Sequence, residues 1–198
     1  MLQESSKAIV LRSVFFKDNQ KIITLFSERF GLISALIKGY SSPIKSSLSE
    51  IFCEAEYLFT KGNSDLRKYQ DGSILDLHLT LRAKLSYLRT AASLTKAILS
   101  SQMPEKASPH LYALFTSFLK QIPHFTAQEQ LLSCFYLKFL RHEGFYHKEC
   151  EMPNLSLEEQ GLLAKIAYLQ SFEELKKEEI SPFLFTYIED FFFQSFKN

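Results

Sequence analysis

The residues with the clearest chemical potential are lysines, arginines and aromatics that interleave near the N-terminus. Residues 1–45 hold seven basic side chains against three acidic ones, whereas residues 148–198 hold five against ten. Basic side chains can follow a phosphate backbone and aromatic rings can stack on bases, so this segment predicts a nucleic-acid surface. An ordinary solvated face over core aromatics explains the pattern equally well. The set comprises Arg12, Phe16, Lys17, Lys21, Arg29, Phe30, Lys38, Tyr40 and Lys45.

Metal binding and catalysis find less support in the sequence. His142, His147 and Cys150 lie within nine residues of one another, but zinc usually takes four ligands and the sequence has no second close pair. We therefore expect surface histidines, no metal and no cofactor. The six glycines form no phosphate-binding motif, and no nucleophile motif or carboxylate cluster stands out. The sequence predicts a protein that is not an enzyme, with Cys53 and Cys134 in its core.

Five stretches near the N-terminus alternate between apolar and polar side chains, as half-buried strands do. In the first stretch, Ile9, Leu11 and Phe15 share one face and Arg12 lies on the other; in the fourth, Cys53, Ala55, Tyr57 and Phe59 share a face. Five short strands in a basic segment predict a small barrel of the OB type. The stretches are Lys7–Phe15, Lys21–Phe26, Leu32–Lys38, Cys53–Lys61 after a loop at 39–47, and a weaker Leu66–Gln70 closed by Asp71 and Gly72.

From about Asp76 onward the apolar residues recur at helical spacing. Helix starts are predicted at Ser108-Pro109, at two capping boxes, Thr126–Glu129 and Ser156–Glu159, and at Ser181-Pro182. The predicted fold is therefore α+β, with a five-stranded OB-fold barrel in residues 1–76 and an all-α helical domain of about five helices in residues 77–198. The last, phenylalanine-rich helix is either buried centrally or presents a partner-binding patch.

Cysteine usage and hydropathy predict a soluble, cytoplasmic protein. The three cysteines form no CxxC pair, and the first ten residues lack the apolar segment of a signal peptide. No stretch reaches the roughly 18–20 apolar residues that a membrane span needs. We therefore expect a reducing compartment and no membrane partner.

The order of motifs in residues 7–45 resembles the N-terminal pattern of the RecO family of bacterial recombination mediators. A strand that ends in Leu-Arg, a strand that runs into a Glu-x-x-Gly turn and a strand that ends in Lys-Gly follow one another as in that family. Weaker similarity, including Phe139–Phe145, covers most of the chain. The residues that carry the resemblance are Ala8, Val10, Leu11, Arg12, Leu25, Phe26, Glu28, Gly31, Leu32, Lys38, Gly39 and Lys45.

The resemblance implies a non-catalytic mediator of DNA repair and homologous recombination in the RecF pathway. Members of this family bind single- and double-stranded DNA, anneal strands, associate with RecR, and help load RecA on DNA coated by the single-strand-binding protein (SSB). The acidic C-terminal tail of SSB docks on the helical domain in that family. The DNA-binding residues would be Arg12, Lys17, Lys21, Arg29, Lys38, Tyr40 and Lys45, extended by Arg82, Lys84 and Arg89 of the basic helical segment.

The chain departs from the family pattern in two places. Many members carry a four-cysteine zinc module after the position that matches Phe139–Phe145, whereas here a helix is predicted about ten residues later, at Ser156; we expect the module and its metal to be absent. Tyr40, Ser41 and Ser42 stand where relatives often have an alanine and a basic cluster. The alternative function is a protein–protein adaptor whose barrel is purely structural.

Overall fold

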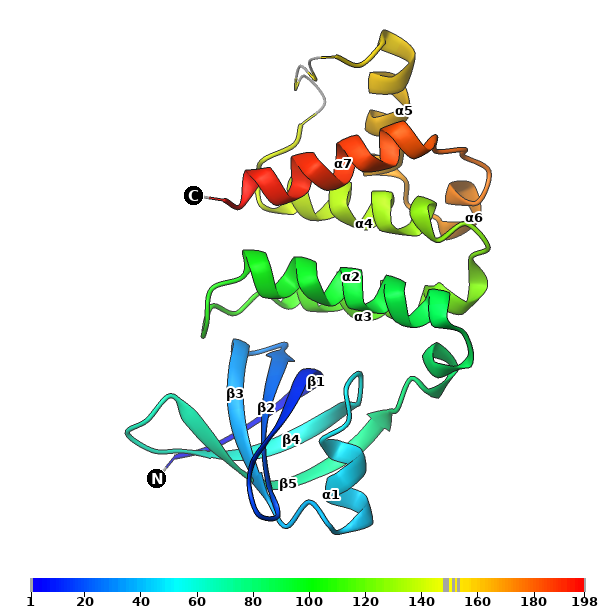
Figure 1. Ribbon diagram of the computed structural model, residues 1–198. Helices are drawn as coiled ribbons and strands as arrows, with labels where there is room; N and C mark the ends of the chain where they lie inside the picture. Colours follow the sequence, from blue (N-terminus) through cyan, green and yellow to red (C-terminus); the bar gives the residue numbers. More distant parts are fainter. Residues whose placement is uncertain (1, 148–149, 151, 153, 198) are drawn as a thin grey trace. The chain divides into compact units, whose positions relative to one another are not determined.

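The computed structural model describes residues 2–147, 150, 152 and 154–197, and its fold is α+β as predicted (Figure 1). The chain divides into two compact units, one formed by residues 1–80 and 102–113 and the other by residues 81–101 and 114–198. The predicted boundary between residues 76 and 77 remains a prediction. The first unit contains β1 (Leu2–Lys17), β2 (Gln20–Ser27), β3 (Gly31–Lys38), α1 (Pro43–Leu48), β4 (Glu54–Lys61) and β5 (Leu66–Asp76).

The five strands form a closed barrel in the order β1-β2-β3-β5-β4. The long strand β1 pairs with β4 through residues 2–9 and with β2 through residues 8–17, both antiparallel. Irregularities in its register with β2, one between Val10 and Arg12, bend β1 so that it joins both neighbours. A short parallel pairing of Ser34–Leu36 with Leu66–Lys68 closes the barrel, which confirms the predicted OB-fold architecture.

The barrel encloses a core of alternate residues from its strands. The predicted face of β4 is confirmed, because all four of its members, from Cys53 to Phe59, are fully buried. Tyr57 also donates a hydrogen bond from its hydroxyl to the carbonyl of Leu48, 2.8 Å away, which joins α1 to the barrel. The other core residues are Ala8, Val10, Ile23, Leu25, Ile33, Ala35 and Ile37.

Three details of the barrel differ from the sequence prediction. Phe15 does not share a buried face with Ile9 and Leu11, since 70% of its surface is exposed while theirs is buried. Strand β5 does not end at Asp71-Gly72 but continues to Asp76, because β4 provides a pairing partner over the whole length. The predicted loop at residues 39–47 contains the start of α1, whose first position is Pro43.

The segment that follows α2 (Leu85–Ser101) returns to the barrel unit. The amide of Glu105 donates to the carbonyl of Leu32 at 2.9 Å. Arg67, which is only 2% exposed, pairs with Glu4 at 2.9 Å and with Glu105 at 2.7 Å. Gly31 has a φ of +65°, and a Cβ at this position would lie 2.0 Å from the carbonyl oxygen of Lys106. A backbone hydrogen bond and an ion pair therefore hold this segment on the barrel.

The second unit is built around α4 (Gln128–His142), which packs against α2, α5 (Leu157–Tyr168), α6 (Phe172–Leu175) and α7 (Pro182–Ser195). Figure 1 shows α7 lying along α4. Their contact is aromatic, with Phe192 packed on Tyr136 and Phe139 at ring-centroid distances of 4.7 and 5.2 Å. The remaining elements are α3 (Pro109–Gln121) and the short 3-10 turns η1 (Leu79–Ala83) and η2 (Ile122–His124).

The helix starts test the capping predictions. Ser156 and Glu159 form the predicted capping box at α5, and Ser181 caps α7. The box predicted at Thr126 is wrong, because α4 begins after Ala127, which has no side-chain acceptor. Helix α7 is buried along one face only, through Leu184, Ile188 and Phe192. None of the helices in the described part of the chain is long and apolar enough to span a membrane.

Candidate nucleic-acid interface

The β1–β2 turn and the β3–α1 loop meet at one end of the barrel. Asn19 joins them, because its backbone carbonyl accepts from the amide of Gly39 at 2.8 Å and its Oδ1 accepts from the amide of Ser41 at 3.1 Å. Strand pairing places Lys17 opposite Gln20, and Gln20 opposite Lys38. Residues that are twenty positions apart in the sequence are thereby gathered on one small surface.

Lys21 lies between two aromatic rings at this end of the barrel. Its Nζ is 5.2 Å from the centroid of the Phe15 ring and 5.0 Å from that of Tyr40, and the two rings meet edge to face at 5.4 Å. The Nζ also donates to Ser49 Oγ at 3.1 Å and lies 3.8 Å from a carboxylate oxygen of Glu50. The side chain of this expected phosphate ligand is thus buried and already has partners, with 8% of the residue exposed.

Three other expected cations lie at this end, and a fourth lies farther along β1. Lys17 and Lys38 are exposed, and Lys45 is half-buried, with its Nζ donating to the carbonyl of Lys38 at 3.1 Å. Lys17 extends over the ring of Phe16, which is 51% exposed, at 5.4 Å from the centroid. Arg12 is exposed but pairs opposite Thr24, in the middle of β2. Cations and exposed aromatic rings therefore share this end of the barrel, an arrangement that can hold phosphates and bases together.

Arg29 lies in the turn at the other end of β2. It is exposed, it donates from a guanidinium nitrogen to the carbonyl of Ser5 at 2.7 Å, and it lies 5.1 Å from the ring centroid of Phe30. Phe30 in turn lies beneath the buried Arg67, at 5.2 Å. The turn with Arg29 is therefore a second basic point on the barrel, separate from the end that carries Lys17 and Lys38.

Three expected DNA-binding residues belong to the helical unit. Arg82, Lys84 and Arg89 are all exposed along η1 and the start of α2, and Lys84 lies 5.1 Å from the ring centroid of Tyr87. Arg89 lines a surface hollow that also contains Glu129 and Glu189. These carboxylates offset part of the positive charge that Arg89 contributes.

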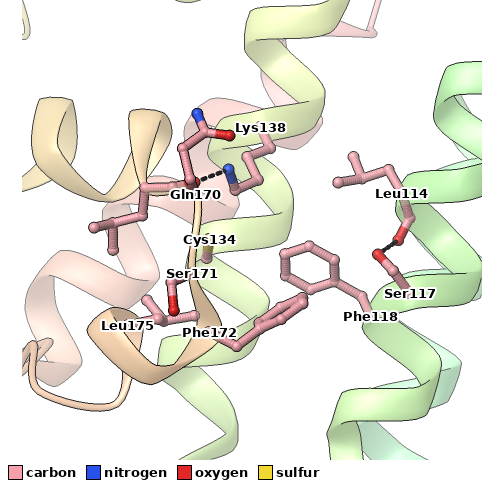
Figure 2. Close-up of a pocket in the computed structure, with 10 residues that line it drawn as sticks. Leu114, Ser117, Phe118, Cys134, Lys138, Gln170, Ser171, Phe172 and Leu175 are labelled. Atoms are coloured by element: carbon pink, nitrogen blue, oxygen red, sulfur yellow. Dashed lines mark hydrogen bonds between the residues drawn. The ribbon is translucent and has the colours of Figure 1, made fainter.

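The helical unit contains a pocket of about 180 Å³ that is lined by both apolar and polar side chains (Figure 2). The rings of Phe118 and Phe172 form one wall, with centroids 5.0 Å apart, and Leu175 lies beside them. Lys138 reaches the pocket and donates to the carbonyl of Leu169, and burial lowers the pKa of its ammonium group. The pocket can therefore hold an apolar side chain with an anionic group close to Lys138.

The candidate metal and nucleophile residues do not assemble into a site in the part of the chain that the structure describes. No three histidine, cysteine, aspartate or glutamate side chains there lie close enough to hold a metal ion. Cys53 and Cys134 are buried, as predicted, and burial raises the pKa of the Cys53 thiol to about 11. A protonated, buried thiol is a poor nucleophile.

Phe15 is the main residue of this surface that the sequence prediction missed. Phe15 and Phe16 end β1 directly before the turn at Asp18 and Asn19, where the register with β2 is irregular between Phe15 and Lys17. The alternation of the first strand does not reveal this irregularity, so it could not show that Phe15 is exposed. Ile44 of α1 is a further exposed apolar residue at this end of the chain's first unit.

Comparison with known proteins connects this barrel to a family. Residues 1–92 match the family described as "Recombination protein O N terminal". The chain is 32% identical over 161 residues to "DNA repair protein RecO" of Chlamydia trachomatis serovar L2, which covers 79% of this chain and 66% of that protein. It is 30% identical over 146 residues to the protein of the same description from Chlorobium limicola, covering 71% of this chain and 55% of that protein. The chain thus spans 66% and 55% of the lengths of these two relatives, less than two thirds of each.

Proposed function

This chain belongs to the RecO family, and on that premise we propose that it is a non-catalytic mediator of DNA repair and homologous recombination. It binds single- and double-stranded DNA, anneals complementary strands and, with RecR, helps RecA replace SSB on single-stranded DNA. The observation that carries the proposal is the group of exposed cations and aromatic rings at one end of a closed OB-type barrel. The protein would act in the cytoplasm, where its three unpaired thiols remain reduced.

The proposed DNA path follows the solvent-exposed cations of the barrel. Arg12, Lys17, Lys38 and Lys45 hold phosphates, while Lys21 supports the aromatic rings because its ammonium group already has partners. Arg29 offers a second phosphate contact at the other end of β2. Arg82, Lys84 and Arg89 are further exposed cations that can hold phosphates on the helical unit.

Titration of a fluorescently labelled oligonucleotide at several salt concentrations tests this proposal. Each phosphate contact with single-stranded DNA contributes about 0.7 to the slope of log affinity against log salt. The four barrel cations Arg12, Lys17, Lys38 and Lys45 therefore predict a slope of about −3, which becomes steeper if the remaining expected cations also take part. Absence of binding at low salt would refute the mediator function and favour the adaptor with a structural barrel.

The same titration separates a mediator from a nuclease. A non-catalytic protein leaves the labelled strand intact when magnesium is added, because DNA cleavage by metal ions needs a carboxylate cluster that holds them. Shortened products on a denaturing gel would contradict the proposal. Addition of RecR to the same reaction is expected to raise the apparent affinity for DNA if the two proteins act as one complex.

The pocket in Figure 2 supports a partner for the helical unit. An acidic C-terminal tail, such as that of SSB, would place an apolar side chain against the wall formed by Phe118 and Phe172 and its carboxylate near Lys138. Phe172→Ala is expected to abolish capture of a labelled tail peptide while leaving DNA binding unchanged. A variant that binds the peptide as well as the parent would exclude this pocket.

A further inference from the structure

We propose that Phe15, Lys21 and Tyr40 form a preformed platform for unpaired bases, so that this end of the barrel favours single-stranded over duplex DNA. The inference rests on the proposed DNA binding of the barrel and adds the basis of strand preference. Its starting point is Phe15, a large apolar side chain that is 70% exposed at the end of β1, whose earlier residues Ala8 and Val10 fill the core. An aromatic ring held in water beside basic groups is typical of a base-stacking residue.

The ring of Phe15 is exposed but held in place. Tyr40 contacts it edge to face at 5.4 Å, and the ammonium group of Lys21 lies 5.2 Å from its centroid. Lys21 is fixed in turn by Ser49 and Glu50, both immediately after α1. A ring that is ordered before the base arrives loses less conformational freedom on binding, which favours affinity. Lys21 is therefore a positioning residue that acts through Phe15 and Tyr40.

A second ring extends the platform around the hairpin. Phe16 is 51% exposed, and Lys17 lies over its ring. Phe16 lies at an irregularity of the β1–β2 register, between Phe15 and Lys17, so both rings stand directly before the β1–β2 turn. A strand that crosses this turn can therefore stack bases on both rings while Lys17 and Lys38 hold its phosphates.

The platform distinguishes single strands from duplexes for a geometric reason. In a duplex the faces of each base are covered by its neighbours, so an aromatic side chain can stack only on a base that has left the helix. Phosphates are available in both forms. Loss of the rings should consequently weaken binding to single strands selectively, whereas loss of the exposed cations should weaken binding to both forms.

The absence of tryptophan from the sequence allows a direct test with the full-length chain. Phe15→Trp introduces a single indole, and we expect its fluorescence to be quenched when oligothymidylate binds and to change little with a matched duplex. Phe15→Ala should lower the affinity for oligothymidylate by about 5- to 150-fold, the equivalent of one stacked base. The matched control is Phe183→Ala in α7, where the phenylalanine is 56% exposed, and its binding should equal that of the parent.

Lys21→Met tests the positioning role, because it keeps an unbranched apolar side chain and removes the charge. We expect Lys21→Met to bind oligothymidylate more weakly with an unchanged slope of log affinity against log salt. If Lys21 instead held a phosphate, its loss would make this slope less steep by about 0.7. Lys21→Arg restores a cation and should recover part of the affinity, which shows that a loss in Lys21→Met is not due to misfolding.

The outcomes separate the two proposals. A parent protein that binds no DNA at low salt overturns the proposed function, and the platform with it. A parent that binds DNA while Phe15→Ala retains full affinity for oligothymidylate overturns the platform alone. The platform is also overturned if Phe15→Ala lowers the affinities for oligothymidylate and for duplex DNA equally. The same holds if anisotropy shows that Phe15→Trp binds oligothymidylate while the fluorescence of its indole is not quenched.

Discussion

Replacement of Gly31 by alanine is expected to destabilise the barrel unit by about 2–5 kcal/mol. The backbone of Gly31 has a φ of +65°, a conformation that costs a residue with a Cβ roughly 1–2 kcal/mol. The added methyl group would also lie 2.0 Å from the carbonyl oxygen of Lys106 and 2.6 Å from its carbonyl carbon. Backbone atoms cannot rotate away as a side chain can, and overpacking of this kind typically costs about 1–3 kcal/mol more.

The expected displacement has a local consequence. Lys106 follows Glu105, whose amide donates to Leu32 and whose carboxylate pairs with the buried Arg67. A shift of the Lys106 carbonyl therefore strains the attachment of this segment to the barrel, and urea unfolding followed by circular dichroism should report it as a lower midpoint with a similar slope.

Gly144→Ala is the matched control for this experiment. Its φ of +83° carries a similar conformational cost, but no heavy atom of the described residues would lie within 4 Å of the new Cβ. We expect a loss of only about 1–2 kcal/mol for this variant. If Gly31→Ala costs no more than Gly144→Ala, the close contact with Lys106 does not contribute to stability and the reasoning is wrong.

Three further predictions concern charge, pH and thiol chemistry. Lys38→Glu combined with Lys45→Glu should make the slope of log affinity against log salt for single-stranded DNA less steep by about 1.4, and should leave the thermal midpoint nearly unchanged. The control is Lys177→Glu with Lys197→Glu, which changes the net charge equally and should leave DNA binding as it is. The hydrogen bonds from Lys61 and then Arg67 lower the pKa of Glu105, so its stabilising effect is complete above its ordinary value of 4.5 and is lost as the pH falls through the folded value. Thermal midpoints measured at pH values below 4.5 should therefore fall less steeply on acidification in Glu105→Gln than in the parent, whereas the two proteins should respond alike between neutral pH and that value. Ellman's reagent should modify Cys150 readily in the native protein and the two buried thiols only after unfolding; fast reaction of all three would contradict the described core.

The barrel was predictable from the sequence because its strands alternate regularly. Tyr57 and Phe59 of β4 illustrate this, since both lie at the predicted period of two and both are fully buried. The period of two fails in β1, which pairs with both β4 and β2 and has register irregularities with β2. Beyond such an irregularity, the residues that face the core no longer follow the alternation seen earlier in the strand. The exposure of Phe15 results from this geometry, and a single strand taken alone does not reveal it.

The candidate site was predictable in its charges but not in their environments. Arg12, for example, lies on the polar face of the first predicted strand and is exposed. The burial of Lys21 depends on Tyr40, Ser49 and Glu50, which reach it only through the path of the β3–α1 loop and α1. Arg67 likewise depends on a carboxylate that lies 38 positions along the chain. Such contacts belong to the tertiary fold and have no local sequence signal.

The return of residues 102–113 to the barrel unit has a consequence for synthesis on the ribosome. The chain leaves this unit after residue 80, forms α2, and only then supplies the second carboxylate of Arg67 and the backbone partner of Leu32. The barrel therefore cannot reach its final set of contacts until the segment around Glu105 has emerged, although all five strands precede residue 77. Until that point Arg67 of the nascent barrel can pair with Glu4 but not with Glu105. A fragment that ends after the last strand is therefore an incomplete folding unit.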